Sequence, residues 1–301
     1  MSTTAPAVLA AEQSPFRRFA SRFAEDRIAM IGLIMLAIII ALAALAPFIA
    51  PQNPYDLARV DIMDSRQPPG AVAGEGFTMW LGSDGVGRDL VSGILYGLRI
   101  SLIVGVLSGI IAATIGLVMG LTAAYAGGRV ETLIMRVVDL QLSLPSVLVA
   151  LILVALMGKG VDKIILALVV VQWAYYARTV RGSALVERRK EYVEAARSLG
   201  LSHARTMFRH ILPNCLAPVI VIATVQTAHA ISLEATLSFL GVGLPQTEPS
   251  LGVLIANGFQ YMLSGKYWIS FFPGLALLVT IVAINLVGDR LRDVLNPRLE
   301  K

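Results

Sequence analysis

The sequence predicts an all-α integral membrane protein with six transmembrane helices and one amphipathic helical loop between two of them. Hydrophobic residues make up 56% of the 301 residues and charged residues only 15%, and the mean hydropathy is +0.73. Soluble globular domains contain about 45–50% apolar and about 25% charged residues. The apolar runs are long and uninterrupted, unlike the alternating segments of about ten residues in a membrane β-barrel, so helices are expected.

Six spans follow from apolar length, because a bilayer core of ~30 Å requires roughly 20 helical residues. Residues 28–49 contain no charge, and neither do residues 100–128. The fourth span is the weakest, since only 14 residues separate Lys163 from Arg178, and both side chains are expected to snorkel to the interfaces. The expected helices are 28–49, 100–125, 137–157, 162–180, 215–240 and 269–288.

Apart from the charged residues near the two ends of the fourth span, ionisable residues of interest occur inside two of these spans. Asp139 begins the third span and is expected at the membrane interface, paired with Arg136 three positions earlier. His229 and Glu234 lie in the fifth span, with Gln226 close to the same face. Because a charge at the bilayer centre costs roughly 2.5–3.5 kcal/mol on insertion scales, these three residues are candidates for lining a pathway. The alternative places Glu234 near the outer interface.

The second span has one flank with little side-chain bulk. Gly105 and Gly109 are four residues apart, as are Gly116 and Gly120. Small residues at this spacing allow two helices to approach closely. The partner helix is expected either within this chain or in a second membrane subunit.

The distribution of Lys and Arg predicts the orientation. The loops on the side that holds both termini contain 18 of these residues, and the opposite loops contain 7. By the positive-inside rule both termini are cytoplasmic, as is the loop after the fourth span. This bias explains the net charge of +5 without nucleic-acid binding. The first apolar run of 22 residues exceeds the core of a signal peptide, about 7–15 residues, so it is expected to stay as a span.

The spans and loops divide the chain into five parts. Cys215 is the only cysteine, which excludes an intrachain disulfide and a Cys-based metal cluster, and no other metal site is expected. The parts are a disordered tail at 1–15, an N-terminal segment with the first span at 16–66, a periplasmic loop at 67–96, a five-helix core at 97–290 and a cytoplasmic tail at 291–301.

The loop after the fourth span reads as two amphipathic helices joined by a turn. Gly200 permits the turn, Ser202 is a candidate N-cap for the second helix, and Pro213 is expected to end or kink that helix. A solvated surface or attraction to anionic lipid would explain the charge, but neither requires a broken helix pair, so a docking surface is favoured. The apolar positions are Leu185, Tyr192, Val193, Ala196 and Leu199 in the first helix, and Ala204, Met207, Phe208 and Ile211 in the second.

This loop resembles the "EAA" loop of permease subunits in ATP-binding-cassette importers. The pattern is EAA, three residues, G, nine residues, I, one residue, LP. His210 stands where the general pattern has Ile, as in a subgroup that reads "RHILPN". The resemblance implies that the loop couples the permease to its ATPase. The matching residues are Glu194, Ala195, Ala196, Gly200, His210, Leu212 and Pro213.

Two further stretches resemble permeases of peptide and nickel importers. "LGSDGVGRDLVSGILYGLRISL" at 81–102 is similar to the segment before the second span in the subunit with a long first periplasmic loop, and "ATLSFLGVG" at 235–243 is similar to the end of the fifth span. Asp84 or Ser83 is expected to cap the following helix. A phosphate-binding loop is rejected because the GK[ST] ending is missing. The candidate periplasmic residues are Gly82, Asp84, Gly87, Arg88 and Asp89.

The resemblance implies a non-enzymatic subunit of an importer in the bacterial inner membrane. No Walker A, HExxH or GxSxG pattern occurs, so no cofactor is expected on this chain, and ATP and Mg belong to two ATPase subunits. A second related permease and a solute-binding protein are the other implied partners. The cargo is expected to be a di- or oligopeptide; alternatives are nickel or another small solute. An ion-coupled transporter using Glu234 and His229 is a different class, in which inverted repeats are common, and none is evident here.

Overall fold

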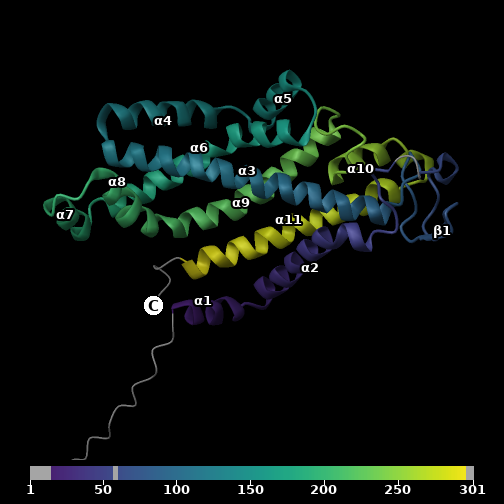
Figure 1. Ribbon diagram of the computed structural model, residues 1–301, viewed down its shortest axis with the longest axis horizontal. Helices are drawn as coiled ribbons and strands as arrows, with labels where there is room; N and C mark the ends of the chain where they lie inside the picture. The colour runs from purple at the N-terminus through teal and green to yellow at the C-terminus, as the bar shows by residue number, and fades with distance from the viewer. Residues whose placement is uncertain (1–14, 57–59, 296–301) are drawn as a thin grey trace, which may run out of the picture.

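The computed structural model describes residues 15–56 and 60–295 and consists of long helices lying side by side along one axis (Figure 1). Within this part of the chain, five helices are long and apolar enough to cross a membrane, and a bent helix pair would make a sixth span. The prediction of an all-α membrane protein is confirmed. The expected tail at 1–15 lies almost wholly outside the described residues.

Among the described residues, five long helices and one bent pair of helices form the bundle, and shorter elements lie at its two ends. The long helices and the bent pair are α2 (Arg27–Ile49), α3 (Leu90–Ala126), α4 (Gly128–Ser143), α5 (Ser146–Met157), α6 (Val161–Glu187), α9 (Leu212–Phe239) and α11 (Trp268–Leu295). The shorter helices are α1 (Pro15–Ala24), α7 (Glu191–Ser198), α8 (His203–Arg205) and α10 (Leu251–Phe259). The remaining elements are the 3-10 turns η1 (Ile62–Asp64) and η3 (Met262–Ser264), the π-helix η2 (Thr206–Ile211), and the antiparallel strands β1 (Ala71–Val72) and β2 (Thr78–Met79).

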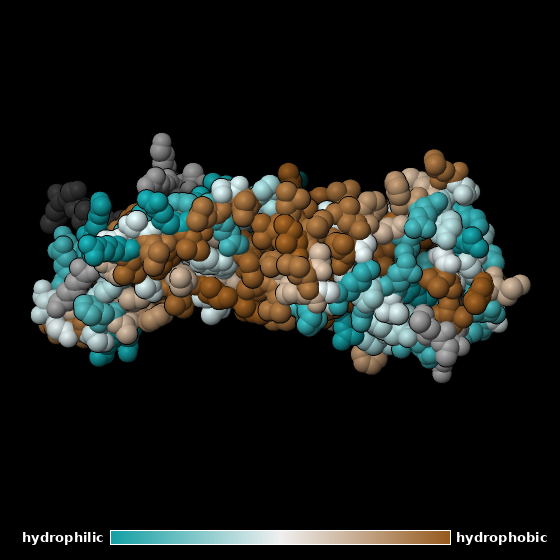
Figure 2. Space-filling model, turned by 90° about the horizontal axis from the view of Figure 1, so that it is seen from above, coloured by the Kyte–Doolittle hydropathy of each residue, from teal (hydrophilic) through white to brown (hydrophobic). Residues whose placement is uncertain are grey.

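The two ends of the bundle are polar and its middle is apolar. Helices α1, α7 and α8 lie at one end, and the strands and α10 lie at the other (Figure 1). Figure 2 shows a broad hydrophobic belt between two hydrophilic ends. Many apolar side chains of α2 and α3 are exposed along this belt, for example Ile28 at 62% and Ile110 at 58%. Such exposure suits contact with lipid or with another membrane subunit.

The third span differs from the single helix expected at 137–157. Helix α4 ends at Ser143, α5 begins at Ser146, and the two are bent by 91°. Pro145 causes the break, because it lacks an N–H and disfavours helical backbone at Leu144. Leu144 accordingly has an extended backbone, with φ −91° and ψ 140°.

The fifth span begins much earlier than residue 215. Helices α8, η2 and α9 form one continuous helical segment of 37 residues, from His203 to Phe239. Pro213, which was expected to end or kink a short helix, lies inside this segment, just after the π-helix η2. The second amphipathic helix is therefore the start of a span. Helix α11 likewise continues to Leu295, into the segment assigned to the C-terminal tail.

The glycines of α3 permit close packing within this chain. A Cβ on Gly116 would lie 2.4 Å from Tyr176 Cβ, and a Cβ on Gly120 would lie 2.5 Å from the carbonyl oxygen of Ala177, both on α6. Neither position tolerates a side chain without a shift of the backbone. The two helices are thereby held in contact along the centre of the bundle.

Two apolar clusters fill the interior where α3, α6 and α9 meet. The α5 cluster lies toward α10 and contains Ile100, Val104, Ala150, Val154, Leu168, Val171, Ala230, Leu233 and Leu237 among others. The α7 cluster lies toward α7 and contains Ala112, Tyr176, Val180, Val193, Ile211, Cys215 and Val219 among others, with Ala223 packed against it. The α7 cluster thus joins the short helix α7 to three spans.

Candidate functional site

Helix α7 is held against the bundle by apolar contacts, and a backbone turn at Gly200 follows it. Val193 and Ala196 are 0% and 4% exposed, and they pack toward the spans. The chain then turns at Gly200, which has φ +71°, and the N–H of Leu201 donates to the carbonyl of Ala196 at 3.2 Å. Ser202 caps the next helix by accepting from the N–H of Arg205 at 3.4 Å. The helix–turn–helix arrangement of this loop follows from these contacts.

A polar network, missed in the sequence, ties α7 to the spans before and after it. The Tyr192 hydroxyl donates to Glu187 Oε2 at 2.7 Å, at the end of α6. Asn214 Nδ2, in the first turn of α9, donates to the same hydroxyl at 3.2 Å and to the carbonyl of His210 at 2.9 Å. Burial and the Glu187 carboxylate raise the pKa of Tyr192 to about 12. Tyr192 therefore stays a neutral donor between two spans.

A hydrogen bond between side chains attaches α8 to α3. The Tyr125 hydroxyl lies 2.7 Å from His203 Nδ1, which joins α8 to the end of α3. Arg188 Nη1 donates to the carbonyl of Ala124 at 2.7 Å and joins the end of α6 to the same place. The α7–α8 unit is thus attached to α3, α6 and α9.

The residues that match the EAA pattern divide between two faces of this unit. Glu194, Ala195 and Pro213 are exposed, Leu212 and His210 are half-buried, and Ala196 is buried. Ile211, at 1% exposure, fills the interior position, and His210 beside it points its carbonyl to Tyr192 and Asn214.

The outer face of the unit carries apolar side chains beside its charges. Leu199 is 79% exposed and Phe208 is 47% exposed, although both were expected in the buried stripe. Glu194 lies on the side of α7 away from Val193 and Ala196. Large apolar side chains exposed among charged ones are typical of a contact surface for another protein.

The three residues proposed to line a pathway have different surroundings. Glu234 is 0% exposed, and its carboxylate accepts from Ser101 Oγ at 3.2 Å and Ser238 Oγ at 2.8 Å. Gln226 is buried at 3% exposure, and His229 is half-buried with Nε2 3.5 Å from Ser146 Oγ. Glu234 is an interior residue that joins α3 to α9.

A pocket of about 360 Å³ lies beside α10, and one of its lining residues, Ser238, is hydrogen-bonded to Glu234. The other polar lining residues are Lys159, Gln246, Asn257 and Gln260, and two aromatic rings, Phe239 and Phe259, pack edge to face at 5.6 Å. Amide side chains with aromatic walls suit a small polar organic molecule.

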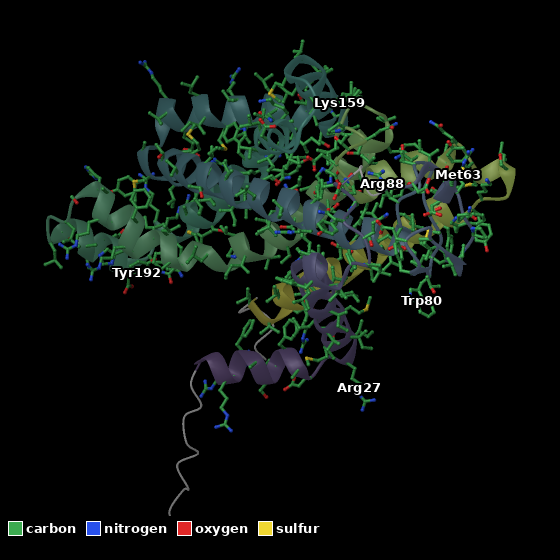
Figure 3. The ribbon with its side chains drawn as sticks, turned by 45° about the vertical axis from the view of Figure 1, so that its right-hand side comes forward. Arg27, Met63, Trp80, Arg88, Lys159 and Tyr192 are labelled. Carbon is green, nitrogen blue, oxygen red and sulfur yellow. The ribbon has the colours of Figure 1, made fainter. Side chains whose placement is uncertain are left out.

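The predicted periplasmic residues form a buried network at the end opposite α7 (Figure 3). Asp84 and Arg88 are 0% and 1% exposed, and Arg88 Nε donates to Asp84 Oδ2 at 2.8 Å. Arg88 Nη1 donates to the carbonyl of Gln246 at 3.1 Å, which joins this segment to the loop before α10. A Cβ on Gly82 would lie 2.6 Å from the carbonyl oxygen of Gln67, and one on Gly87 would lie 2.3 Å from that of Asp61.

The helix cap at this end was assigned wrongly. Asp89, rather than Asp84 or Ser83, caps α3, because its Oδ2 accepts from the N–H of Ser92 at 2.8 Å and from Ser92 Oγ at 2.7 Å. Gln52 Oε1 accepts from the N–H of Asp89 at 2.9 Å and ties the cap to the chain after α2. Burial raises the pKa of Asp89, and its hydrogen bonds with Ser92 oppose this effect.

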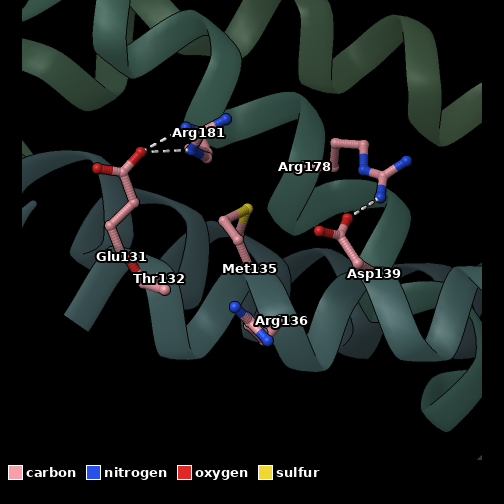
Figure 4. Close-up of a pocket in the computed structure, with 7 residues that line it drawn as sticks. All are labelled: Glu131, Thr132, Met135, Arg136, Asp139, Arg178 and Arg181. Atoms are coloured by element: carbon pink, nitrogen blue, oxygen red, sulfur yellow. Dashed lines mark hydrogen bonds and ion pairs between the residues drawn. The ribbon is translucent and has the colours of Figure 1, made fainter. Parts of the chain in front are cut away.

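A second pocket, of about 530 Å³, lies between α4 and α6 and is lined by opposite charges (Figure 4). Arg181 Nε donates to Glu131 Oε1 at 2.8 Å, and Arg178 pairs with Asp139. The expected pair of Asp139 with Arg136 is not formed, because α6 presents Arg178 directly opposite Asp139. These two ion pairs connect α4 to α6.

Comparisons with known proteins identify the family. The chain matches a binding-protein-dependent transport system inner membrane component over residues 114–301, and the N-terminal transmembrane domain of oligopeptide transport permease C over residues 14–69. It is 41% identical over 288 residues to the dipeptide transport system permease protein DppC of Escherichia coli K12, covering 96% of this chain and 95% of that protein. It is 37% identical over 287 residues to the di/tripeptide transport system permease protein DppC of Pseudomonas aeruginosa UCBPP-PA14, covering 95% and 93%.

A solved structure shares the arrangement of helices. An inward-facing form of the MetNI methionine ABC transporter aligns with a TM-score of 0.55 and 20% identity, covering 68% of this chain and 96% of that one. The prediction of an importer permease rather than an enzyme is confirmed by the relatives. The chain belongs to the family of inner-membrane permease components of binding-protein-dependent ABC transport systems, in its oligopeptide and dipeptide branch.

Proposed function

We propose that this chain is one of two related membrane subunits of an ATP-driven importer for di- or oligopeptides. Two separate ATPase subunits, which bind ATP and Mg, supply the energy, and a solute-binding protein delivers the cargo. Peptide cargo is favoured over nickel or another small solute because the named relatives are described as dipeptide or di/tripeptide permeases. The pocket beside α10, with its amides and aromatic rings, is a suitable entrance for such a cargo.

The proposed orientation places α7, α8 and both termini in the cytoplasm. The loops at that end contain 18 of the 25 Lys and Arg residues. This bias favours retention of the α7 end on the cytoplasmic side of the inner membrane. The strands and α10 then face the periplasm, where the solute-binding protein docks.

The observation that carries the proposal is the attachment of α7 to the spans on both sides of it. Tyr192 bonds to Glu187 on α6 and to Asn214 on α9, and Val193 packs into the α7 cluster. A force applied to the exposed face is therefore transmitted to two spans together. Differential contacts of this face in the two nucleotide states of the ATPases shift the spans between inward-facing and outward-facing forms.

The Gly200→Val variant tests this coupling. Gly200 has φ +71°, which a β-branched residue strongly disfavours, so the turn between α7 and α8 must change. In proteoliposomes with the ATPase subunits and the loaded binding protein, we expect peptide uptake and cargo-stimulated ATP hydrolysis to fall together.

Gly182→Val is the matched control. Gly182 lies in α6 on the same side of the bundle, is exposed, and has no atom within 4 Å of its Cβ position among the described residues. Its uptake should equal that of the parent. Normal uptake and normal assembly of Gly200→Val would remove the coupling assignment.

A further inference from the structure

The charged pocket between α4 and α6 has more positive than negative charge on its lining (Figure 4). Its ionisable lining residues are three arginines and two carboxylates. Arg181 pairs with Glu131 and Arg178 pairs with Asp139, whereas Arg136 forms no ion pair within the part of the chain that the structure describes. Arg136 is also exposed, so its guanidinium is available to an anion.

This pocket lies at a level of the bundle where another side is apolar. A Cβ on Gly120 of α3 would lie 2.5 Å from the carbonyl oxygen of Ala177 and 3.1 Å from the backbone nitrogen of Arg181, so Gly120 is level with the pocket. Val118 lies two residues away, on the opposite side of α3, and is 45% exposed. The same level therefore exposes an apolar side chain on one side of the bundle and charges on another.

The charges of this pocket belong to membrane spans but do not face the core of the chain. Helix α4 is part of the bent pair that makes one span, and α6 is a span. The side chains of Arg178 and Asp139 are 52% and 66% exposed, so the pocket opens on the surface. Ionisable residues in spans are costly in contact with lipid, and they usually face protein or a water-filled cavity. The opening is therefore expected to face water between two membrane subunits.

Polar groups continue from this pocket along the side of the bundle that holds α4 and α5 (Figure 1). Gln141 and Ser146 line a smaller pocket at the break between the two helices. Ser146 Oγ lies 3.5 Å from His229 Nε2, which places one of the residues expected to line a pathway beside this series. Helix α5 leads from the break to Lys159, which lines the pocket beside α10.

We propose that these pockets form the wall that this chain contributes to the translocation path, and that Arg136 binds the terminal carboxylate of a peptide in transit. This inference rests on the peptide importer proposed above and gives its cargo a place on the chain. Glu131 and Asp139 lie five and three residues from Arg136, or roughly 5–8 Å along α4. An extended dipeptide is about 7 Å long. The pocket thus offers charges of both signs to the two ends of an unblocked peptide.

Thiol labelling of the assembled transporter tests whether the charged pocket faces water. Cys215 is the only cysteine and is 0% exposed, so an introduced cysteine can be modified selectively. A charged, membrane-impermeant thiosulfonate is applied to inside-out vesicles. We expect it to modify Thr132→Cys, in the pocket, many-fold faster than Val118→Cys, at the same level on the apolar side. Equal rates for the two variants would overturn the proposal.

Protection by a peptide tests the role of Arg136. The dipeptide alanylalanine should slow the modification of Thr132→Cys several-fold, and the same dipeptide blocked at both ends should not. Adding Arg136→Gln should abolish this protection, and adding Arg129→Gln should preserve it. Arg129 is the matched control, because it is an exposed arginine on the same helix that does not line the pocket.

Three results would contradict the inference. Labelling that is slowed by anionic lipid but not by the dipeptide would identify a lipid headgroup site instead. Protection that persists in Arg136→Gln would remove the role of Arg136. Peptide uptake in proteoliposomes separates this inference from the proposed function. A parent that imports peptide without showing protection overturns only the inference, whereas a parent that imports no peptide overturns the proposed function as well.

Discussion

The two ends of the bundle use the same kinds of residue in opposite ways. At the end with the strands, Asp84, Arg88 and Asp89 are at most 1% exposed and bond to one another or to distant loops. At the end with α7, Glu194 and Leu199 face outward. Figure 3 shows Arg88 inside the first end and Tyr192 at the other. Charge that is buried and paired holds a structure together, whereas charge that is displayed is available to a partner.

The glycines show the same contrast. Gly87 and Gly200 both have positive φ, at +99° and +71°. The Cβ position of Gly87 is blocked by the Asp61 carbonyl at 2.3 Å, and that of Gly200 has no described atom within 4 Å. One turn is enclosed by its neighbours, and the other is free on the surface.

The largest expected effect comes from breaking the buried ion pair. Arg88→Met leaves the Asp84 carboxylate buried without its cation, and such a loss costs about 3–5 kcal/mol. We expect little folded protein and a strongly lowered melting temperature in detergent. Arg178→Met is the matched control, since its pair with Asp139 is more than half exposed and is worth at most about 1 kcal/mol. Equal losses in the two variants would erase the contrast between buried and exposed charge.

The next largest effect is the loss of stability when the glycine of either turn, Gly87 or Gly200, is replaced by alanine. Gly87→Ala adds a steric clash to backbone strain and is expected to destabilise by about 2–3 kcal/mol. Gly200→Ala adds strain alone, about 1 kcal/mol. The two melting temperatures, measured in the same detergent, provide the check. A larger drop for Gly200→Ala would show that the α7 turn is the more constrained one.

A smaller effect is expected from Tyr192→Phe. The variant loses the hydrogen bonds to Glu187 and Asn214, which together contribute roughly 1 kcal/mol at this half-exposed position. Since the pKa of Tyr192 is raised to about 12, its stabilising contribution is complete below the usual tyrosine pKa of about 10 and is lost as the pH rises toward 12. The parent and the variant should therefore differ by a constant amount between pH 6 and about pH 9. We also expect peptide uptake to fall further than this small loss of stability alone would explain, because the link between α6 and α9 is lost. Retention of full uptake would contradict the assigned role of this network.

The smallest effect is expected from Asp89→Asn. Asn is as good an N-cap as Asp, so α3 keeps its first turn. Because burial raises the pKa of Asp89 in the folded state, the parent loses stability as the pH rises from the usual aspartate pKa through the raised value. The variant lacks this loss. As the pH rises from 4 to 7, the melting temperature should fall less in the variant than in the parent. A steeper fall in the variant would show that burial does not raise the pKa of Asp89.

The sequence predicted what depends on local composition. Apolar length located the spans, and the pattern from Glu194 to Pro213 located the loop. The break in the third span was missed although Pro145 was visible, because the apolar flanks of Pro145 suggested one continuous helix. The start of the fifth span at His203 was hidden by the charges on its first turns.

Contacts between distant residues were not predictable in the same way. The bonds of Tyr192 to Glu187 and Asn214, and of Asp89 to Gln52, depend on how the spans place their ends. The exposure of Leu199 was missed for a similar reason, since helical spacing alone put it on the stripe of Val193 and Ala196. The turn at Gly200 directs Leu199 away from the bundle.

The most direct test of the account is a comparison of crosslinks from the two ends. A photoreactive amino acid is placed at Leu199, 79% exposed beside α7, and separately at Trp80, 71% exposed at the strand end. In the assembled transporter in native membranes, Leu199 should capture a nucleotide-hydrolysing subunit and Trp80 should not. Capture of that subunit from Trp80, or its absence at Leu199 in an assembly that transports, would contradict the account.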